Sequence, residues 1–291
     1  MTTIYDWLVG PFADYAFMRK ALFGCLLLSL SSCPVGVFLM LRRMSLTGDA
    51  MSHAVLPGAA LGFLLYGLKI VPMTIGGLIA GALVAACAGA VARLTIQRED
   101  ASMAAFYLMS LAVGVMIVSL RGSSVDLMHV LFGTVLALNT EALTLILVIA
   151  GTTLVALAAS WRTLVAECLD PLFLRSVSTL GPVVHFVFLA LVVLNLVGGF
   201  QALGTLLSVG LMMLPATTAR FWATRVTTMC VISAAIGAVS SLVGLLLSYH
   251  LELPSGPSII LAASSLYLVS LLASPRGLIA YRFPPSAHRR A

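Results

Sequence analysis

Long apolar runs, separated by short polar segments, recur along the whole chain. They lie at about residues 21–41, 52–67, 74–95, 103–120, 140–160, 182–199, 202–220, 226–248 and 257–273. A run of about 20 apolar residues is long enough to cross the hydrocarbon core of a bilayer as an α-helix. Gly198, Gly199 and Gln201 interrupt the stretch 182–220, which therefore forms two membrane-spanning helices or one such helix and a half-helix. The pattern predicts an all-α, polytopic membrane protein with eight or nine transmembrane helices.

Composition supports this class. The 291 residues are 61% hydrophobic and only 9% charged, a balance that excludes a soluble domain. The net charge of +6 is therefore attributed to loops between spans and not to a nucleic-acid surface. The first residues lack the basic region and short apolar core of a cleavable signal peptide, so none is expected. The cysteines form no CxxC pair and are interpreted as packing residues; they are Cys25, Cys33, Cys87, Cys168 and Cys230.

The positions of Lys and Arg predict which side of the membrane each loop faces. With nine spans and a cytoplasmic C-terminus, twelve of the 16 basic residues fall on the cytoplasmic side, as cytoplasmic loops require. The four on the outer side are Arg19, Lys20, Lys69 and Arg121. Arg19 and Lys20 favour a cytoplasmic N-terminus, which eight spans would provide. The twelve cytoplasmic residues are Arg42, Arg43, Arg93, Arg98, Arg162, Arg175, Arg220, Arg225, Arg276, Arg282, Arg289 and Arg290.

Two segments outside the apolar runs have a character of their own. Residues 1–18 are rich in aromatic side chains, which predicts a helix lying at the membrane interface, with an ordered tail as the alternative. Residues 161–181 carry mixed charge, with Leu169 and Leu172 at helical spacing, together with Phe173. Asp170 is a suitable N-cap before a proline, and Gly181 suits the end of a helix. Such an amphipathic helix either lies on the bilayer or docks a soluble partner, and amphipathicity by itself favours the bilayer.

The stretch from Gly48 to Gly58 places Asp49 and His53 four residues apart at the opening of the second apolar run. On a helix the two side chains share one face, with Cβ atoms about 6 Å apart. A carboxylate and an imidazole are suitable ligands for Zn²⁺, Mn²⁺ or Fe²⁺, and polar groups within membrane spans usually line a site or a path. Further ligands must come from elsewhere in the fold or from water. The alternative is that Asp49 caps the following helix and His53 hydrogen-bonds a neighbouring helix.

The remaining polar residues give weaker indications of function. Asp126 and His129, three residues apart on the outer side, form a second metal site or merely cap a helix and face water. His185 and His250 lie near the ends of apolar runs, where interface packing is expected. The sequence contains neither GxxxxGK[ST] nor HExxH, which excludes P-loop binding of ATP and the usual zinc-protease chemistry. Few polar groups and 24 glycines favour a transport pathway over an enzyme.

Four sequence blocks occur in a distinctive order. They are Arg42–Gly58, Val125–Met128 with Leu131–Gly133, Gly204–Arg220 and Leu253–Pro257. Together they resemble the permease subunit of the bacterial zinc, manganese and iron ABC importers, over nearly the whole chain from about Phe17 to Pro275. The first block is the most specific. His129 and Thr134 depart from the family pattern of the second block, so neither is assigned a metal role.

The resemblance implies an architecture and a set of partners. We expect an ABC importer permease similar in fold to the cobalamin and siderophore importers, located in the bacterial cytoplasmic (inner) membrane. Residues 19–275 would form the transmembrane permease domain, residues 161–181 a cytoplasmic coupling loop, and residues 276–291 a basic cytoplasmic tail. The expected partners are a second copy of the chain, two copies of a cytoplasmic ATP-binding subunit and an extracytoplasmic solute-binding protein. The chain itself would be a transport subunit and not an enzyme.

The resemblance also implies roles for individual residues. Asp49 and His53 match the family's Asp and His and are expected to bind the transported Zn²⁺ or Mn²⁺, with Fe²⁺ as a further candidate. Two Asp49 carboxylates at the two-fold axis would offset the divalent charge, while metal binding requires neutral His53 and weakens as the pH falls. ATP stays on the partner subunit, and no cofactor belongs to this chain. The alternative function is a proton-coupled secondary metal transporter that works without an ATPase.

The position of the coupling loop in related importers implies docking on the ATPase, in preference to the bilayer. The expected docking residues are Asp170, Leu172, Phe173 and Arg175. Closure of the ATPases would move this loop and expose the metal site alternately to the two sides.

Overall fold

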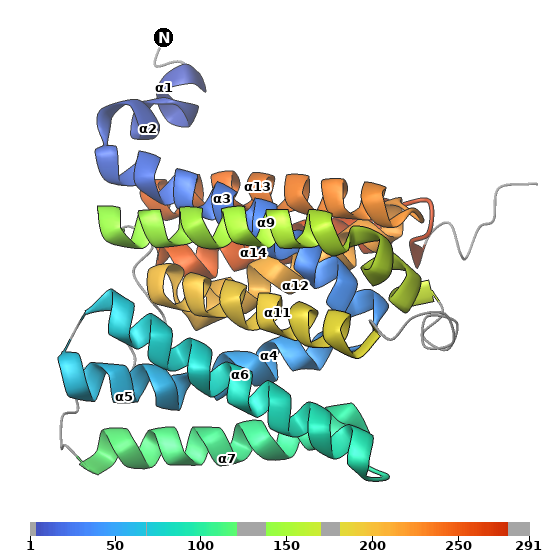
Figure 1. The fold of residues 1–291 in the computed structure, drawn as a ribbon. Helices are drawn as coiled ribbons and strands as arrows, with labels where there is room; N and C mark the ends of the chain where they lie inside the picture. The colour runs from blue at the N-terminus through green and yellow to red at the C-terminus, as the bar shows by residue number, and fades with distance from the viewer. Residues whose placement is uncertain (1–3, 68, 121–137, 170–180, 279–291) are drawn as a thin grey trace, which may run out of the picture.

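The computed structural model describes residues 4–67, 69–120, 138–169 and 181–278 (Figure 1). Within these ranges every regular element is a helix, which confirms the predicted all-α fold. The helices are α1 (Ile4–Leu8), α2 (Gly10–Asp14), α3 (Ala16–Leu41), α4 (Ser45–Ala54), α5 (Leu56–Tyr66), α6 (Ile70–Leu94), α7 (Glu99–Leu120), α9 (Thr140–Leu169), α11 (Gly181–Leu203), α12 (Thr205–Trp222), α13 (Val226–Leu251) and α14 (Ser255–Ala273).

The long helices run back and forth along a common axis (Figure 1). Seven of the described helices are long and apolar enough to cross a membrane by themselves, namely α3, α6, α7, α9, α11, α13 and α14. Helix α12 and the α4–α5 pair run alongside them (Figure 1). When these two are added to the seven, the described helices make nine passes, the higher of the two numbers predicted.

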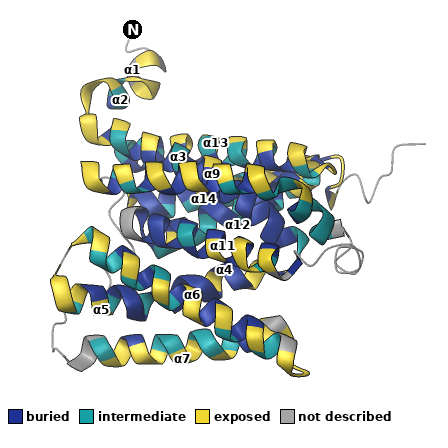
Figure 2. Ribbon diagram, in the orientation of Figure 1, coloured by how far each residue is buried: buried dark blue, intermediate teal, exposed yellow. Residues whose placement is uncertain are grey.

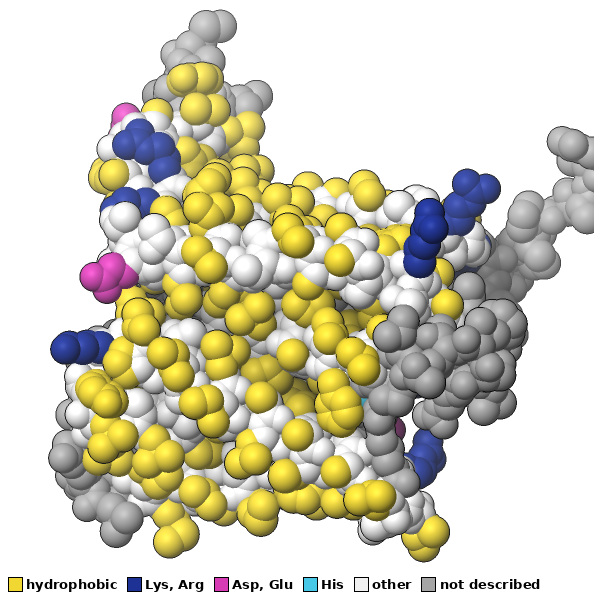
Figure 3. All heavy atoms as spheres, viewed as in Figure 1, with side chains coloured by type: hydrophobic (Ala, Val, Ile, Leu, Met, Phe, Trp, Pro, Cys, Tyr) yellow, Lys and Arg dark blue, Asp and Glu magenta, His cyan; other side chains and the backbone are white. Residues whose placement is uncertain are grey.

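Basic side chains gather at the end of the bundle where the odd-numbered passes finish. Arg42 follows α3, Arg220 lies in the last turn of α12, and Arg276 follows α14. Apolar side chains cover the middle of the face seen in Figure 3, and Lys and Arg side chains lie towards both ends. By the positive-inside rule the more basic end is cytoplasmic, which leaves α1 at the outer end. Arg19, the residue that argued against this placement, donates to the carbonyl of Ala13 at 3.0 Å.

The predicted interfacial segment forms two short helices, α1 and α2, before α3 begins at Ala16. Both turn away from the axis of the bundle (Figure 1). The ring of Trp7 stacks on that of His250 at the end of α13, with centroids 4.6 Å apart, and Nε2 of His250 lies 3.0 Å from the Trp7 carbonyl oxygen. Tyr15 packs on Tyr249 next to this pair. His250 therefore has the packing role expected of it, and the location of residues 1–18 at the membrane surface stays a prediction.

The second apolar run is not the single helix expected over residues 52–67. Helix α4 begins earlier, at Ser45, and α5 ends at Tyr66, with a break at Val55 between them. Pro57, in the first turn of α5, has no N–H to donate to the carbonyl of His53, and proline is well accommodated in that turn. The break therefore falls inside the Gly48–Gly58 stretch, directly after His53.

The stretch 182–220 forms two helices, the first of the two possibilities. The division lies at Gly204 and not at Gly198 or Gly199, both of which lie within α11. Gly204 has a φ of 93°, a conformation that is unfavourable for residues with a Cβ atom. The turn between α11 and α12 therefore lies at Gly204, the glycine between these two helices that has a positive φ.

Helix α9 continues through Leu169, so the first part of the predicted coupling loop is a continuation of the membrane helix. Leu164 is buried, and the ring of Trp161 meets that of Phe38 edge-on at 5.5 Å. This packing explains why the helix does not stop at residue 160. The remainder of the loop lies outside the described residues, including Asp170, Leu172, Phe173 and Arg175, and so do Asp126 and His129.

Buried residues concentrate where α3, α11 and α12 meet, whereas α6, α7 and α9 carry many exposed side chains (Figure 2). The exposed side chains include a stripe along α6 at helical spacing, formed by Val71, Ile75, Ile79 and Leu83. An apolar stripe of this length faces lipid or another apolar subunit. Cys25, Cys33 and Cys230 are free and buried, in agreement with their predicted packing role.

Candidate metal site on helix α4

Helix α4 has one buried face and one exposed face. Thr47, Ala50, Met51 and Ala54 are buried at the spacing of successive helical turns. The opposite face carries Leu46, Asp49 and His53. The buried face packs against α7 and α11, so the helix is held in place while its polar side chains remain accessible.

Asp49 and His53 lie side by side on this exposed face, as their spacing predicted. Nε2 of His53 is 3.9 Å from Oδ1 of Asp49, and the side chains are 35% and 65% exposed, respectively. At this separation both atoms can approach one cation, since metal–ligand distances of about 2.0–2.2 Å for nitrogen and oxygen place two ligand atoms some 3–4 Å apart.

The capping interpretation of Asp49 does not hold. Met44 occupies the N-cap of α4 and Val55 that of α5, and neither cap has a side-chain hydrogen bond. Asp49 lies in the interior of α4, where its carboxylate is not needed to cap a helix. The carboxylate is therefore available for an ion or a partner.

Two contacts from α7 hold the region around His53. The ring of Tyr107 lies 6.2 Å from that of His53, centroid to centroid, and tilted by 30°. The hydroxyl of Ser110 donates to the carbonyl of Ala54 at 3.0 Å, directly before the break between α4 and α5. Nδ1 of His53 is buried without a hydrogen-bond partner, so the alternative in which His53 bonds a neighbouring helix is not observed. Packing, and not hydrogen bonding, orients the imidazole.

The depth of the pair matters as much as its geometry. From Ser45, at the basic end of the bundle, Asp49 lies about 6 Å and His53 about 12 Å along the helix axis, at 1.5 Å per residue. An ionised carboxylate facing the hydrocarbon core would be unfavourable, so this face of α4 borders water, lipid headgroups or another protein surface.

The described part of one chain does not complete a metal site by itself. Among the residues that the structure describes, no group of three or more His, Cys, Asp or Glu side chains converges to hold an ion. Asp49 and His53 supply two ligands, whereas zinc sites use four and manganese sites commonly six. The missing ligands come from water, from residues outside the described ranges or from another chain.

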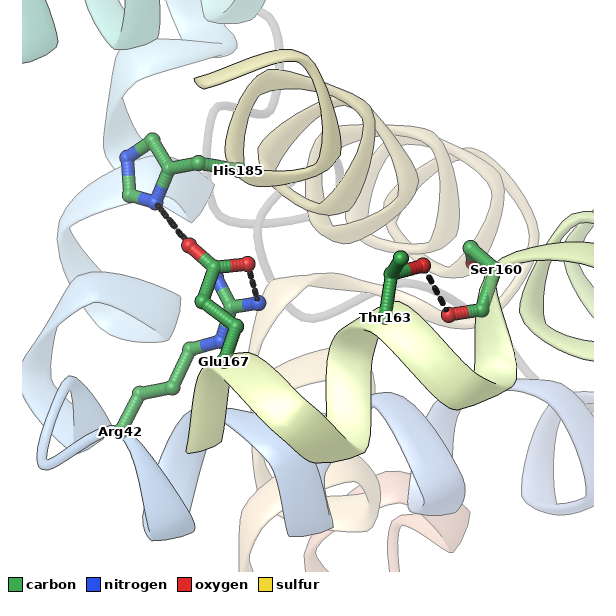
Figure 4. A network of polar contacts seen from close by, with 5 residues as sticks. All are labelled: Arg42, Ser160, Thr163, Glu167 and His185. Atoms are coloured by element: carbon green, nitrogen blue, oxygen red, sulfur yellow. Dashed lines mark hydrogen bonds and ion pairs between the residues drawn. The ribbon is translucent and has the colours of Figure 1, made fainter. Parts of the chain in front are cut away.

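A second polar cluster, which sequence reasoning missed, lies at the basic end (Figure 4). Nη2 of Arg42 donates to Oε2 of Glu167 at 2.7 Å, and Nδ1 of His185 is 4.0 Å from Oε1 of the same carboxylate. From the sequence, Arg42 is interpreted as an orientation signal and His185 as a packing residue. The available signal was Glu167, an acidic residue near the end of a long apolar helix.

Together these features define a class, a multi-pass helical membrane protein with a carboxylate–imidazole pair set within its passes. Comparison with known proteins makes the class specific. The model of the ABC 3 transport family matches residues 14–274, and the chain therefore belongs to that family.

Several curated relatives match almost the full length of the chain. The manganese import system permease protein ScaB of Streptococcus parasanguinis is 31% identical over 263 residues, covering 90% of this chain and 92% of that protein. The chelated iron transport system membrane protein YfeD of Yersinia pestis is 28% identical, with 94% of this chain and 90% of that protein covered. The predicted resemblance to permease subunits of bacterial metal importers is confirmed, as is a multi-pass location in the bacterial inner membrane.

Two solved structures share the fold. PsaBC from Streptococcus pneumoniae in complex with Fab matches with a TM-score of 0.84 and 30% identity, covering 96% of this chain and 99% of that one. An inward-facing metal-chelate type ABC transporter matches with a TM-score of 0.64, over 87% of this chain and 85% of that one. At 16% identity the second match supports the fold alone.

Proposed function

We propose that this chain is the membrane-spanning subunit of an ATP-driven importer of a divalent transition metal, and that two copies of it enclose the pathway. The observation that carries the proposal is the Asp49–His53 pair, 3.9 Å apart and exposed on an otherwise uncharged pass. This combination suits a pathway for a divalent cation, because a carboxylate offsets charge and a neutral imidazole replaces water as a ligand.

The incomplete ligand set supports a second copy. Two chains related by a two-fold axis would supply two Asp49 carboxylates and two His53 imidazoles, which make four ligands of suitable chemistry. The same pairing would cover the exposed carboxylates at a depth where lipid is unfavourable. A two-fold dimer would thus complete the set of metal ligands and shield the carboxylates from lipid.

Manganese is the first candidate for the transported ion, and iron the second. Relatives that match most of the chain are named as manganese and as iron transport proteins. The chemistry of Asp49 and His53 also suits zinc, since one carboxylate and one imidazole are ligands for all three metals. Ligand type therefore does not distinguish the three metals, and a transport measurement must identify the one that is carried.

The ATP-binding partner is proposed to dock on the segment between α9 and α11. Helix α9 ends at Leu169 and α11 begins at Gly181, and both of these residues lie at the basic end of the bundle, the end expected to face the cytoplasm and its ATP. The proposed contact residues remain Asp170, Leu172, Phe173 and Arg175. An extracytoplasmic binding protein would deliver the metal to the opposite end, where α5 and α13 finish.

The test is metal uptake by the complete complex in proteoliposomes. We would reconstitute the chain with its ATPase and binding protein, and supply Mn²⁺, Zn²⁺ and Fe²⁺ separately. Asp49→Ala and His53→Ala should each reduce uptake by at least tenfold, the effect of removing about 1.4 kcal/mol of site stabilisation. Asp100→Ala, which removes an exposed carboxylate at the cytoplasmic end of α7, is the matched control and should leave uptake unchanged.

Each outcome bears directly on the proposal. Loss of uptake in both site variants, with ATP hydrolysis retained, supports the pathway, and the wild-type rates identify the metal. Normal uptake in both variants would overturn the role of the pair. Uptake by the chain alone, driven by a proton gradient, would instead support the alternative of a secondary transporter.

A further inference from the structure

The Arg42–Glu167–His185 network joins three helices at the cytoplasmic end (Figure 4). Arg42 is the C-cap of α3, Glu167 lies in the last turn of α9, and His185 lies in the first turns of α11. Nη1 of Arg42 is 3.4 Å from Nδ1 of His185, in addition to the ion pair with Glu167. One guanidinium therefore touches both helices that flank the connection between α9 and α11.

The network is largely removed from solvent. The side chains of Arg42, Glu167 and His185 are 7%, 16% and 12% exposed. The guanidinium carbon of Arg42 lies 4.3 Å from the centroid of the Phe188 ring, a buried cation–π contact, while Nε of Arg42 is buried without a hydrogen-bond partner. Arg42 is thus held by contacts on several sides and has little freedom to move independently of α9 and α11.

Stability by itself does not explain this choice of residues. Burying charged groups carries a large desolvation cost, and well-packed apolar side chains of similar volume often stabilise a fold equally well or better. What an ion pair with directional hydrogen bonds adds is a defined relative position of the elements that it joins. Here the ion pair defines the position of the residues directly after α3 relative to α9 and α11.

The segment directly after α3 connects it to α4, the helix that carries the candidate metal site. Arg42 is separated from Ser45, the first residue of α4, by only Arg43 and Met44. Arg43 adopts a φ of 60°, and the N–H of Met44 bonds the carbonyl of Leu39, so the turn is tight and closed on itself. A shift of the Arg42 backbone must therefore move the start of α4, which carries Asp49 and His53.

We propose that Arg42, Glu167 and His185 are positioning residues that couple α9 and α11 to α4, so that movement at the cytoplasmic end during the ATP cycle is passed to the metal site. The inference rests on the proposed function. It differs from a general role in folding because it concerns the metal transported for each ATP hydrolysed, and not the amount of assembled protein.

The experiment compares variants in the reconstituted complex, with Mn²⁺ uptake and ATP hydrolysis measured on the same vesicles. Arg42→Met alone leaves Glu167 buried without its partner and is expected to impair folding. The informative variant is therefore the double substitution Arg42→Met with Glu167→Leu, which removes both charges and retains apolar packing. The control is Arg98→Met, which removes an exposed arginine directly before α7 at the same end of the bundle.

We expect the double variant to assemble and hydrolyse ATP, while Mn²⁺ imported per ATP falls about fivefold or more, as for the loss of a typical coupling energy. Arg98→Met should keep the wild-type ratio. The inference is overturned if the double variant keeps that ratio, or if uptake and hydrolysis fall only in parallel with the amount of complex. Failure of the wild-type complex to import any metal would overturn the proposed function instead, so the two failures are distinguishable.

Discussion

Gly58 on α5 and Gly76 on α6 approach so closely that a Cβ atom on either residue would overlap the backbone carbonyl of the other. The contact is mutual and involves main-chain atoms, which cannot rotate away as a side chain can. Helices in membranes gain stability from close backbone approach, because lipid offers no hydrophobic driving force between them. This pair of glycines therefore fixes how α5, which follows the candidate metal site, packs on α6.

The first prediction concerns this contact. Gly58→Ala should lower the free energy of unfolding by about 1–3 kcal/mol, the cost of overpacking a site that cannot relax. Gly151→Ala is the matched control, because no atom lies within 4 Å of a Cβ placed there and alanine is the better helix former. Thermal unfolding of the detergent-solubilised protein measures both. Equal melting temperatures for the two variants would show that the helices separate freely.

The second prediction concerns the imidazole of His53. His53→Asn replaces the ring nitrogen with an amide, a weaker ligand for a transition metal, so Mn²⁺ uptake should fall severalfold while ATP hydrolysis persists. Initial rates of Mn²⁺ uptake by the reconstituted complex provide the measurement. Wild-type uptake by His53→Asn would show that the imidazole does not bind the metal in transit.

The third prediction concerns the break between α4 and α5. Pro57→Ala would provide an N–H that can bond the His53 carbonyl, and the two helices should become more continuous. We expect uptake to fall severalfold while ATP hydrolysis persists, because a straighter α4–α5 pair would shift the backbone that carries His53. Pro72→Ala is the control, since a proline in the first turn of α6 removes no helical hydrogen bond. Full uptake by Pro57→Ala would mean that the break is unimportant for transport.

The fourth prediction concerns the N-terminal helices. Trp7→Ala removes the ring that stacks on His250, a contact worth about 0.5–1.5 kcal/mol. Limited trypsin digestion at Arg19 and Lys20 should then release the N-terminal segment faster than in the wild type. Tyr5→Ala, at an exposed aromatic position in the same helix, should leave the cleavage rate unchanged. Identical rates for all three proteins would show that the stacking does not anchor α1.

Local periodicity was enough to predict several features correctly. The apolar runs predicted the membrane helices, because the length of a run is compared directly with the thickness of the bilayer. The spacing of Asp49 and His53 predicted their common face, because residues four apart on a helix are neighbours whatever the rest of the fold does. Predictions failed where a boundary depended on packing, as at Leu169, where α9 continues because residues such as Leu164 are buried against other helices.

The sequence by itself therefore determined the class of protein and the candidate ligand pair, and narrowed the number of passes to eight or nine, because all of these depend on short-range properties of the chain. Only the tertiary structure decided that Arg42 meets Glu167, 125 residues away, and His185, 143 residues away. Such contacts depend on which helix ends come together, and no periodic pattern within one helix encodes them. The physical reason is that helix pitch is a property of neighbouring residues, whereas burial of a charge is a property of the whole assembly of helices.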